Sequence, residues 1–558
     1  MIRLIITTLI AAAAASPPTV RTAQGLVRGV ALADARVDVF RGIPYGESTA
    51  GAGRWRAPVA KASWAPGATL DATAFGAGCP GWDKPSAPPY VTALNLSTSE
   101  DCLYLNVWRP SFSSPLEERK PSAAAAALLP VAVWLHGGGF LFGTGANPVW
   151  DGVHYANRTG NALIVVTLNY RLGALGFLPA ADAGAANFGL RDQQLALRWV
   201  QQNIAAFGGD PRAVMLFGQS AGAMSVLCHL ASPLARGLFS RAAAFSPGAV
   251  RYRPLAAYAP HAATLSRALG CSGKAPAPAN YSCMRAKPHA DVVREQLLPE
   301  YAHEPYDPTQ GNGTGVKHFN LVPWVPAVGD ALLPASPLAA FNASRNASRL
   351  LPLDELDGLL IGSVGRETAA FYGSNSTLLY EALFGLIFTR HAPAIETRYA
   401  ATLKGAGAFA AATEASTDYL FGCYTRAVAR AAAARGVATF AYEFAHAPSA
   451  GARVTSVDKP ACLRVPCHAS DNMFNFGTAD RVANATFTSF ERALSGAMRR
   501  AVAAFAYGEA AAATGYPRYN ATRPVRRVWG GANEVISSTV AGYRAPFCDW
   551  WDRLGWIF

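Results

Sequence analysis

Short runs of apolar residues, each closed by glycine or polar residues, recur along the chain and predict buried strands. Four of them are residues 130–135 (PVAVWL), 214–217 (VMLF), 359–362 (LLIG) and 439–444 (TFAYEF). Apolar runs of this length are typical of strands that are covered on both faces. Directly after the second run, residues 223–227 (AMSVL) are compatible with a helix. The pattern therefore predicts a strand that turns sharply into a helix near residue 220.

The first fifteen residues have the layout of a secretory signal peptide. Arg3 is followed by the apolar run 4–10 and then by alanines as far as Ala15. One positive charge, a short apolar stretch and a small-residue exit are the features of such a peptide, and Ala13 and Ala15 fit cleavage after residue 15. The run is shorter than the roughly 18–20 apolar residues of a membrane span. We therefore expect a signal peptide over 1–15 and no stable membrane anchor.

Composition indicates a large folded core rather than disorder. Of the 558 residues, 51% are hydrophobic and 15% are charged, whereas disordered chains show the reverse balance. The net charge of +13 raises the question of a nucleic-acid partner. The basic residues are nevertheless scattered, with only short doublets such as Arg499-Arg500 and Arg526-Arg527, and a nucleic-acid site would gather them on one face. We therefore expect a basic surface and no nucleic-acid partner.

Asparagine sequons and cysteines both indicate an extracellular protein. Nine N-x-S/T sequons occur in a chain with few asparagines, so several are expected to lie on glycosylated surface loops. Nine cysteines fall into local pairs rather than metal-ligand quartets, which favours disulfides and gives no reason to expect a metal or other cofactor. The sequons begin at Asn95, Asn157, Asn280, Asn312, Asn342, Asn346, Asn375, Asn484 and Asn520.

The predicted strand-to-helix turn contains the sequence Gly218-Gln219-Ser220-Ala221-Gly222. In a G-x-S-x-G motif the serine occupies a strained turn, and the two glycines leave room for the neighbouring strand and helix. The amino end of the helix then directs free N–H groups and its positive dipole end toward the serine. We therefore predict that Ser220 is a nucleophile.

A second glycine-rich turn follows the strand 130–135, in the sequence His136-Gly137-Gly138-Gly139-Phe140. Consecutive glycines can direct backbone N–H groups to one point without interference from side chains. The amides of Gly138 and Gly139, together with that of Ala221, are predicted to form an oxyanion hole. The alternative is a glycine-rich exit from a strand with no catalytic role.

Together these motifs resemble the type-B carboxylesterase family, which includes carboxylesterases, cholinesterases and lipases. The resemblance extends from about residue 18 to residue 551, and implies an α/β-hydrolase fold: a mostly parallel central sheet flanked by helices, with helical insertions forming the pocket. It also implies one catalytic domain over residues 16–558. The segments that carry it are 207–222 (FGGDPRAVMLFGQSAG), 100–110 (EDCLYLNVWRP), 40–45 (FRGIPY), 169–171 (NYR) and 189–193 (GLRDQ).

The order of catalytic residues along an α/β-hydrolase chain is nucleophile, acid, histidine. His468 lies in a segment, 467–477 (CHASDNMFNFG), that is similar to the family's histidine loop, with His446 as the competitor. The resemblance assigns the acid to Glu367, with Asp354 and Asp357 as alternatives.

The segment around Glu367 departs from the family pattern. The family usually has an acidic residue before this glutamate and a glycine after it, where this chain has Arg366 and Thr368.

Further contacts are expected to support the fold. The resemblance implies a Cys79–Cys102 disulfide and two ion pairs, Glu100 with Arg54 and Arg171 with Asp192. Three more cysteine pairs are expected, Cys228 is expected to be a buried free thiol, and residues 111–129 are expected to be a surface insertion. The further pairs are Cys271–Cys283, Cys423–Cys548 and Cys462–Cys467.

The resemblance implies a secreted serine ester hydrolase that acts on a small-molecule ester through an acyl-serine intermediate. Gln219 stands where cholinesterases usually carry glutamate, and Trp82 lies only three residues after Cys79 rather than near Cys102. Both departures argue against choline esters. A lipase acting on glycerides is the alternative, and a non-catalytic binding protein of the same fold is a remoter one.

Overall fold

The computed structural model describes residues 17–82, 96–111, 128–157, 161–273, 277–297, 323–343, 351–370, 392–449, 462, 465–482, 485–509, 514–531, 535–542 and 544–554. Most of the predicted insertion at 111–129, the signal peptide at 1–15, and sequon asparagines 95, 312, 346, 375 and 484 lie outside these residues.

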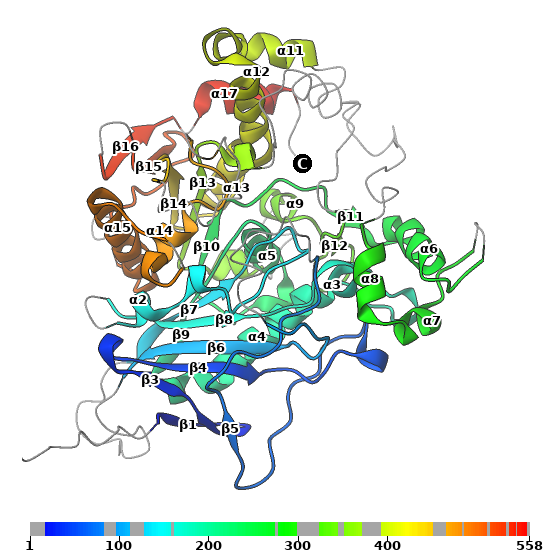
Figure 1. Ribbon diagram of the computed structural model, residues 1–558. Helices are drawn as coiled ribbons and strands as arrows, with labels where there is room; N and C mark the ends of the chain where they lie inside the picture. The colour runs from blue at the N-terminus through cyan, green and yellow to red at the C-terminus, as the bar shows by residue number, and fades with distance from the viewer. Residues whose placement is uncertain are drawn as a thin grey trace, which may run out of the picture.

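Within the described residues, eleven strands form one central sheet in the order β16-β15-β14-β13-β10-β9-β7-β8-β6-β4-β3 (Figure 1). The strands from β15 to β8 in this order are parallel, whereas β16 at one edge and β6, β4 and β3 at the other pair in antiparallel fashion. The strands are β3 (Val30–Leu32), β4 (Val37–Pro44), β6 (Tyr104–Pro110), β7 (Leu129–Leu135), β8 (Ile164–Leu168), β9 (Gly209–Gln219), β10 (Arg241–Phe245), β13 (Gly358–Val364), β14 (Thr439–Phe444), β15 (Val525–Trp529) and β16 (Ser537–Ala541).

The four predicted strands are confirmed as β7, β9, β13 and β14, and the expected α/β-hydrolase architecture, a mostly parallel sheet flanked by helices, is observed. Two small sheets accompany the central one: β1 (Thr19–Thr22), β2 (Gly25–Arg28) and β5 (Thr69–Asp71) in the first, and β11 (Arg253–Pro254) and β12 (Ala327–Val328) in the second.

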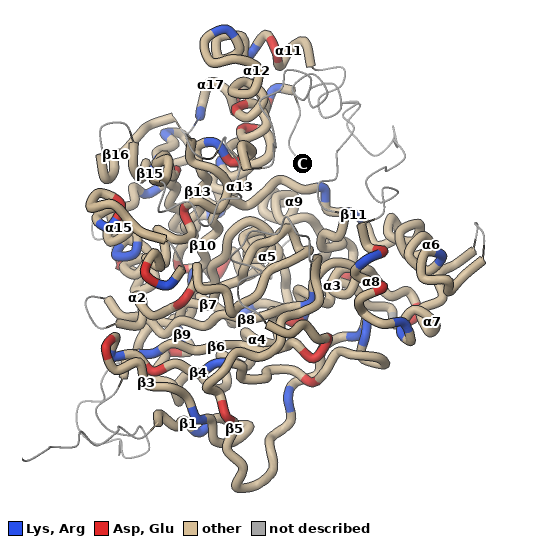
Figure 2. The backbone as a smooth tube through the Cα atoms, viewed as in Figure 1, with Lys and Arg blue, Asp and Glu red and all other residues tan. Residues whose placement is uncertain are grey.

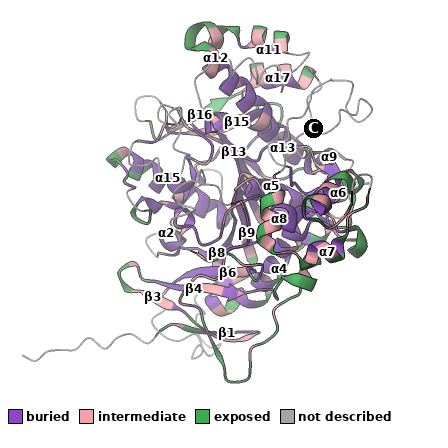
Figure 3. Cartoon of the chain, turned by 45° about the vertical axis from the view of Figure 1, so that its right-hand side comes forward, coloured by how far each residue is buried: buried purple, intermediate pink, exposed green. Residues whose placement is uncertain are grey.

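Helices cover both faces of the sheet because its strands are apolar at successive positions. Along β7, Val131 and Val133 pack into one core cluster, whereas Ala132 and Trp134 pack into another on the opposite face. The central strands are accordingly buried along most of their length (Figure 3). The helices are α2 (Val153–Ala156), α3 (Gly173–Phe177), α4 (Phe188–Asn203), α5 (Ala221–Leu230), α6 (Ala259–Ala268), α7 (Tyr281–Ala286), α8 (His289–Glu295), α9 (Pro337–Asn342), α11 (Ala392–Arg398), α12 (Ala400–Thr417), α13 (Cys423–Ala434), α14 (Asn472–Phe476), α15 (Ser489–Ala506) and α17 (Ala545–Arg553).

Local sequence explains where key helices begin. Helix α15 starts at a capping box, in which the Thr488 hydroxyl accepts a hydrogen bond from the Glu491 amide (3.1 Å) and the Glu491 carboxylate accepts one from the Thr488 amide (2.8 Å). Such a box satisfies two N–H groups that the first helical turn leaves free.

Helices α11, α12 and α17 gather at one end of the molecule around their own small apolar cluster.

The expected covalent and ionic supports are present. All four predicted cysteine pairs are bonded, and Cys228 is free and buried. The buried pairs Arg54–Glu100 (2.5 Å) and Arg171–Asp192 (2.7 Å) are formed. Basic and acidic positions are interspersed over the chain (Figure 2). Among the described residues, no helix has the length and apolar character needed to cross a membrane.

Candidate active site

Ser220 stands at the turn between β9 and α5, in a conformation that non-glycine residues rarely adopt (φ 57°, ψ −123°). The flanking glycines are required by close backbone contacts. A Cβ on Gly222 would lie 2.0 Å from the Leu135 carbonyl oxygen, and one on Gly218 would lie 2.7 Å from the same atom. A strained residue that its neighbours hold in place is typical of a functional site, and the turn has the form expected for a G-x-S-x-G nucleophile.

The glycine turn after β7 lies directly against this serine. Gly138 and Gly139 have positive φ angles of 116° and 60°, and a Cβ on Gly137 would lie 3.0 Å from the Cβ of Ser220. The Gly138 carbonyl accepts hydrogen bonds from the amides of Leu141 (2.9 Å) and Phe142 (3.2 Å), which fixes the turn. The predicted donors Gly138 and Gly139 therefore lie in a turn that packs against Ser220, the residue directly before the third predicted donor, Ala221.

His136 supports the glycine turn from within the core, a role that the sequence reasoning missed. Its ring is fully buried and stacks on Tyr170, with ring centroids 4.4 Å apart, while Nδ1 lies 2.8 Å from the Gly137 carbonyl oxygen. Burial lowers the pKa of His136 to about 4, so the ring is neutral near pH 7. In the sequence, the position of His136 directly before Gly137 was the feature that could have indicated this supporting role.

His468 and Glu367 form a buried hydrogen-bonded pair. The His468 Nδ1 lies 2.6 Å from Glu367 Oε2, and the other carboxylate oxygen accepts a hydrogen bond from the Val364 amide (2.6 Å). The His468 Nε2 lies 3.1 Å from the side-chain nitrogen of Gln219, the residue immediately before Ser220. Donation from the Gln219 amide to Nε2 requires the tautomer that carries its proton on Nδ1, so the Nε2 lone pair faces the turn that contains Ser220 and accepts this hydrogen bond.

The alternative residues are engaged elsewhere. His446 Nε2 lies 3.1 Å from Glu491, the capping residue of α15. Asp354 pairs with Arg435 (2.8 Å), and the half-exposed Asp357 pairs with Arg241 (3.4 Å). Of the candidate acids, the structure therefore brings only Glu367 to His468 within the described residues.

The unusual neighbours of Glu367 tie its loop to α12. The Arg366 guanidinium donates to the Ala410 carbonyl (3.1 Å) and lies 3.6 Å from Glu414. The Thr368 hydroxyl donates to the Thr413 carbonyl (2.9 Å). These two departures from the family pattern thus anchor the acid loop to a helix that follows it by more than thirty residues.

A second buried carboxyl, Asp471, lies in the histidine loop. It is fully buried and accepts a hydrogen bond from the Tyr442 hydroxyl (2.9 Å). Burial, followed by the negative charge of Glu367, raises the pKa of Asp471 to about 7. No role was predicted for Asp471, because its position three residues after His468 does not indicate that its carboxyl group is buried.

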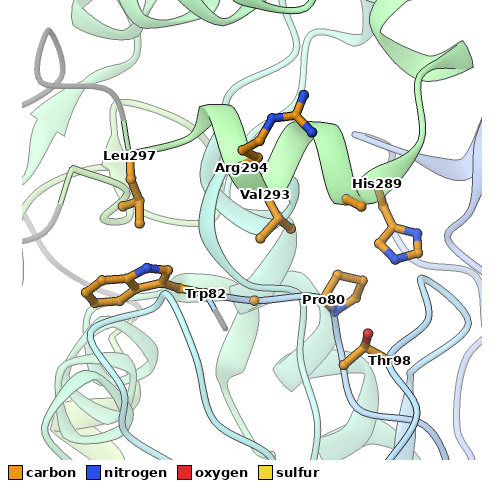
Figure 4. Close-up of a pocket in the computed structure, with 9 residues that line it drawn as sticks. Pro80, Trp82, Thr98, His289, Val293, Arg294 and Leu297 are labelled. Atoms are coloured by element: carbon orange, nitrogen blue, oxygen red, sulfur yellow. The ribbon is translucent and has the colours of Figure 1, made fainter. Parts of the chain in front are cut away.

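A pocket of about 520 Å³ opens between α8 and the segment that follows Cys79. Trp82 and Pro80 face Val293 and Leu297 across it, while the Arg294 side chain points away (Figure 4) and pairs with Asp291 (2.7 Å). One wall of the pocket is hydrogen-bonded to the segment that follows the glycine turn: the Trp82 amide donates to the Leu141 carbonyl (2.8 Å). The lining residues are Pro80, Gly81, Trp82, Thr98, His289, Ala290, Val293, Arg294 and Leu297.

The strand-to-helix serine turn, the glycine turn and the histidine–glutamate pair all follow the carboxyl ends of parallel strands, which is where α/β proteins place their sites. This architecture is that of an α/β-hydrolase. A family model described as "Carboxylesterase family" matches residues 16–532, so the chain belongs to the carboxylesterase family.

Individual relatives agree with this assignment. The mouse bile salt-activated lipase is 33% identical over 400 residues, which cover 68% of this chain and 59% of the lipase. The acetylcholinesterase of Bungarus fasciatus is 37% identical over 337 residues, 58% of this chain and 50% of that enzyme. A solved PNB esterase structure superimposes with a TM-score of 0.74 at 28% identity, covering 96% of this chain and 99% of the esterase. The chain thus matches between half and three fifths of these two curated relatives' length.

Proposed function

We propose that this protein is a secreted serine carboxylesterase that hydrolyses small-molecule esters through an acyl-serine intermediate. The observation that carries the proposal is the orientation of His468, whose Nδ1 is hydrogen-bonded to the buried Glu367 while its Nε2 lies against the residue before Ser220. A histidine held in this way is a general base for an adjacent hydroxyl.

The proposed reaction has two steps. The Ser220 hydroxyl attacks the ester carbonyl while His468 takes its proton, and the amides of Gly138, Gly139 and Ala221 stabilise the oxyanion. The carbon–oxygen bond to the alcohol then breaks, and His468 returns the proton to the leaving oxygen. Water attacks the acyl-serine with His468 again as base, which releases the carboxylic acid and restores the Ser220 hydroxyl. Glu367 keeps the tautomer and stabilises the imidazolium in both steps.

Removal of the nucleophile tests this proposal. Ser220→Ala should lower turnover of an activated ester to near background without changing the thermal unfolding profile. A fluorophosphonate probe should label the wild-type protein on Ser220 and leave the variant unlabelled. Turnover by Ser220→Ala at the wild-type rate would refute the assignment, and a wild-type protein that resists the probe would favour a non-catalytic binding protein.

We propose that the substrates are general esters rather than choline esters. Gln219 supplies no negative charge beside the serine, and its amide is engaged with His468 (3.1 Å). Glycerides are the alternative substrate class. A series from acetyl to long-chain esters separates the two, because a sharp maximum for long chains on emulsified substrate would favour a lipase.

Export as a glycoprotein is supported by the four disulfides, which persist in oxidising compartments. Sequon residues Asn280, Asn342 and Asn520 are exposed, and Asn157 is half-buried. The test is expression in a secreting host: the medium should contain a protein that begins at Ser16 and loses mass on treatment with an N-glycosidase. Retention inside the cell at full length would contradict the proposal.

A further inference from the structure

A short disulfide lies directly before the proposed general base. Cys462 and Cys467 are bonded, and Cys467 is the residue next to His468 in the chain. Both cysteines are buried, with exposed fractions of 2% and 0%. They pack on the alanines at 369–370, in the loop that carries Glu367. The bond therefore lies between the histidine loop and the acid loop.

Main-chain hydrogen bonds join the same two loops. The Arg366 amide donates to the Pro466 carbonyl (3.1 Å). Next to it, the His468 amide donates to the Glu367 carbonyl (3.2 Å). The acid loop has supports of its own, because the Glu367 carboxylate accepts a hydrogen bond from the Val364 amide (2.6 Å). The acid loop is thus a fixed support on which the disulfide holds the start of the histidine loop.

The turn that contains the histidine has a strained backbone. Ala469 has a φ of 68°, in the left-handed region that alanine rarely adopts and keeps only where its surroundings impose it. Beyond this residue the chain is anchored by Asp471, whose carboxylate accepts a hydrogen bond from the Tyr442 hydroxyl (2.9 Å). The Ser470 amide donates back to the Cys467 carbonyl (3.0 Å). The disulfide therefore anchors the first residue of the turn, and Asp471 anchors the chain just after it.

The spacing of this disulfide favours a local role over general stabilisation. Its cysteines are separated by 5 positions, against 12, 23 and 125 for the other three pairs. In the chain-entropy account, the stabilisation by a disulfide decreases with the length of the loop that it closes. The bond at Cys467 should therefore contribute least of the four to the free energy of unfolding, and its main effect should fall on the residues beside it.

We propose that the Cys462–Cys467 disulfide is a positioning element for the general base, an inference that rests on the proposed function. The bond holds Ala469 in its strained conformation, and this conformation keeps the His468 imidazole hydrogen-bonded to Glu367. Without the bond, the turn can relax toward an ordinary negative φ, which moves the backbone that carries the imidazole. A general base must stay aligned with its nucleophile, so the relaxed turn should be less active.

The test compares kcat and KM for an activated ester at a temperature at which each variant is folded. Cys462→Ala/Cys467→Ala removes the bond and keeps apolar side chains in the cluster. It should lower kcat about tenfold and change KM by less than about twofold, because alignment of the base is lost rather than substrate binding.

Ala469→Gly separates positioning from general support, because glycine adopts a positive φ without strain. In the variant without the bond, this substitution should raise kcat by about threefold or more, since the turn no longer has to be forced into shape. With the bond intact, it should give no such gain. A disulfide that only stabilised the fold would show no such dependence on residue 469.

The matched control is Cys271→Ala/Cys283→Ala, which removes another local disulfide, one that ends on α7. This variant should keep the wild-type kcat even if its melting temperature falls. If Cys462→Ala/Cys467→Ala does not fold, the bond is removed in the Ala469→Gly protein. There kcat should stay within about threefold of Ala469→Gly itself.

Four results would overturn the inference: a wild-type kcat in the folded variant without the bond, an equal loss in the control, no gain from Ala469→Gly when the bond is absent, or a loss of about tenfold or more on removing the bond from the Ala469→Gly protein. A wild-type protein without Ser220-dependent hydrolysis would instead refute the proposed function, so the two failures are distinguishable.

Discussion

Glu367→Gln isolates the electrostatic part of the proposed mechanism, because the side chain keeps its shape and loses its charge. Both oxygens of Glu367 accept hydrogen bonds, one from the Val364 amide (2.6 Å) and one from His468 Nδ1 (2.6 Å). A glutamine has only one acceptor oxygen, so its NH₂ group must face one of these two donors. Facing His468, it forces the proton onto Nε2 and removes the base; facing Val364, it places two donors together in a fully buried site.

The expected loss follows from this geometry. A wrong imidazole tautomer with otherwise intact geometry lowers kcat by about 10⁴-fold in a serine hydrolase, which corresponds to about 5 kcal/mol of transition-state stabilisation. The buried donor pair should also lower the free energy of unfolding by about 1–3 kcal/mol.

Steady-state hydrolysis of an activated ester measures the first effect, and denaturant unfolding measures the second. The control is Asp357→Asn, which alters a half-exposed carboxylate paired with Arg241 and should leave kcat unchanged. If Glu367→Gln retained more than a tenth of the wild-type kcat, the assignment of the acid would be refuted.

Three further predictions concern stability. Gly222→Ala places a Cβ 2.0 Å from a neighbouring carbonyl oxygen and should lower the melting temperature by several degrees. The control is Gly273→Ala, whose Cβ would have no atom within 4 Å and should leave the melting temperature unchanged. Equal melting temperatures for the two variants would contradict the close-contact argument. The pKa of Asp471 is raised from its ordinary 3.8 to about 7, so the unfolded chain gives up this proton near pH 4 and the native protein only near pH 7. The contribution of this group to the free energy of unfolding therefore falls as the pH rises from 4 to 7, by about 1.4 kcal/mol per pH unit at most. Denaturant unfolding of Asp471→Asn should show its gain over wild type growing across that range, and a constant difference would refute this. Replacing Cys423 and Cys548 by serine should lower stability by about 2–5 kcal/mol, measured by thermal unfolding, and an unchanged melting temperature would show that the bond adds nothing.

Sequence reasoning located the parts of the site that depend on local backbone geometry. Ser220 and the glycines around it could be predicted because the turn itself demands those residues in that order. Glu367 and His468 required the chain order of the fold and similarity to family motifs. All three lie where the parallel strands end, and the structure brings the last two within hydrogen-bonding distance.

The supporting contacts could not be predicted, because they depend on packing between distant segments. In the sequence, Arg366 and Thr368 were recognisable only as departures from the family pattern around the glutamate. The structure shows that both side chains contact α12. Phe421 lies in a stretch that is indistinguishable from ordinary helix in sequence. Only the π-helical turn η14 (Asp418–Gly422) brings its ring to that of His468, with centroids 4.9 Å apart. The burial of Asp471 depends on Tyr442 from another strand.

The strand order has a consequence for biosynthesis. The nucleophile strand β9 lies between β7, which carries the glycine turn, and the strands β10, β13 and β14. Gln219 and His468, whose side chains meet, are 249 positions apart. A nascent chain that has folded only through β10 therefore holds the serine and the glycine turn but no base. In the proposed mechanism, ester cleavage can begin only after the chain has been synthesised past residue 468, so the protein stays inactive while most of the chain is being made.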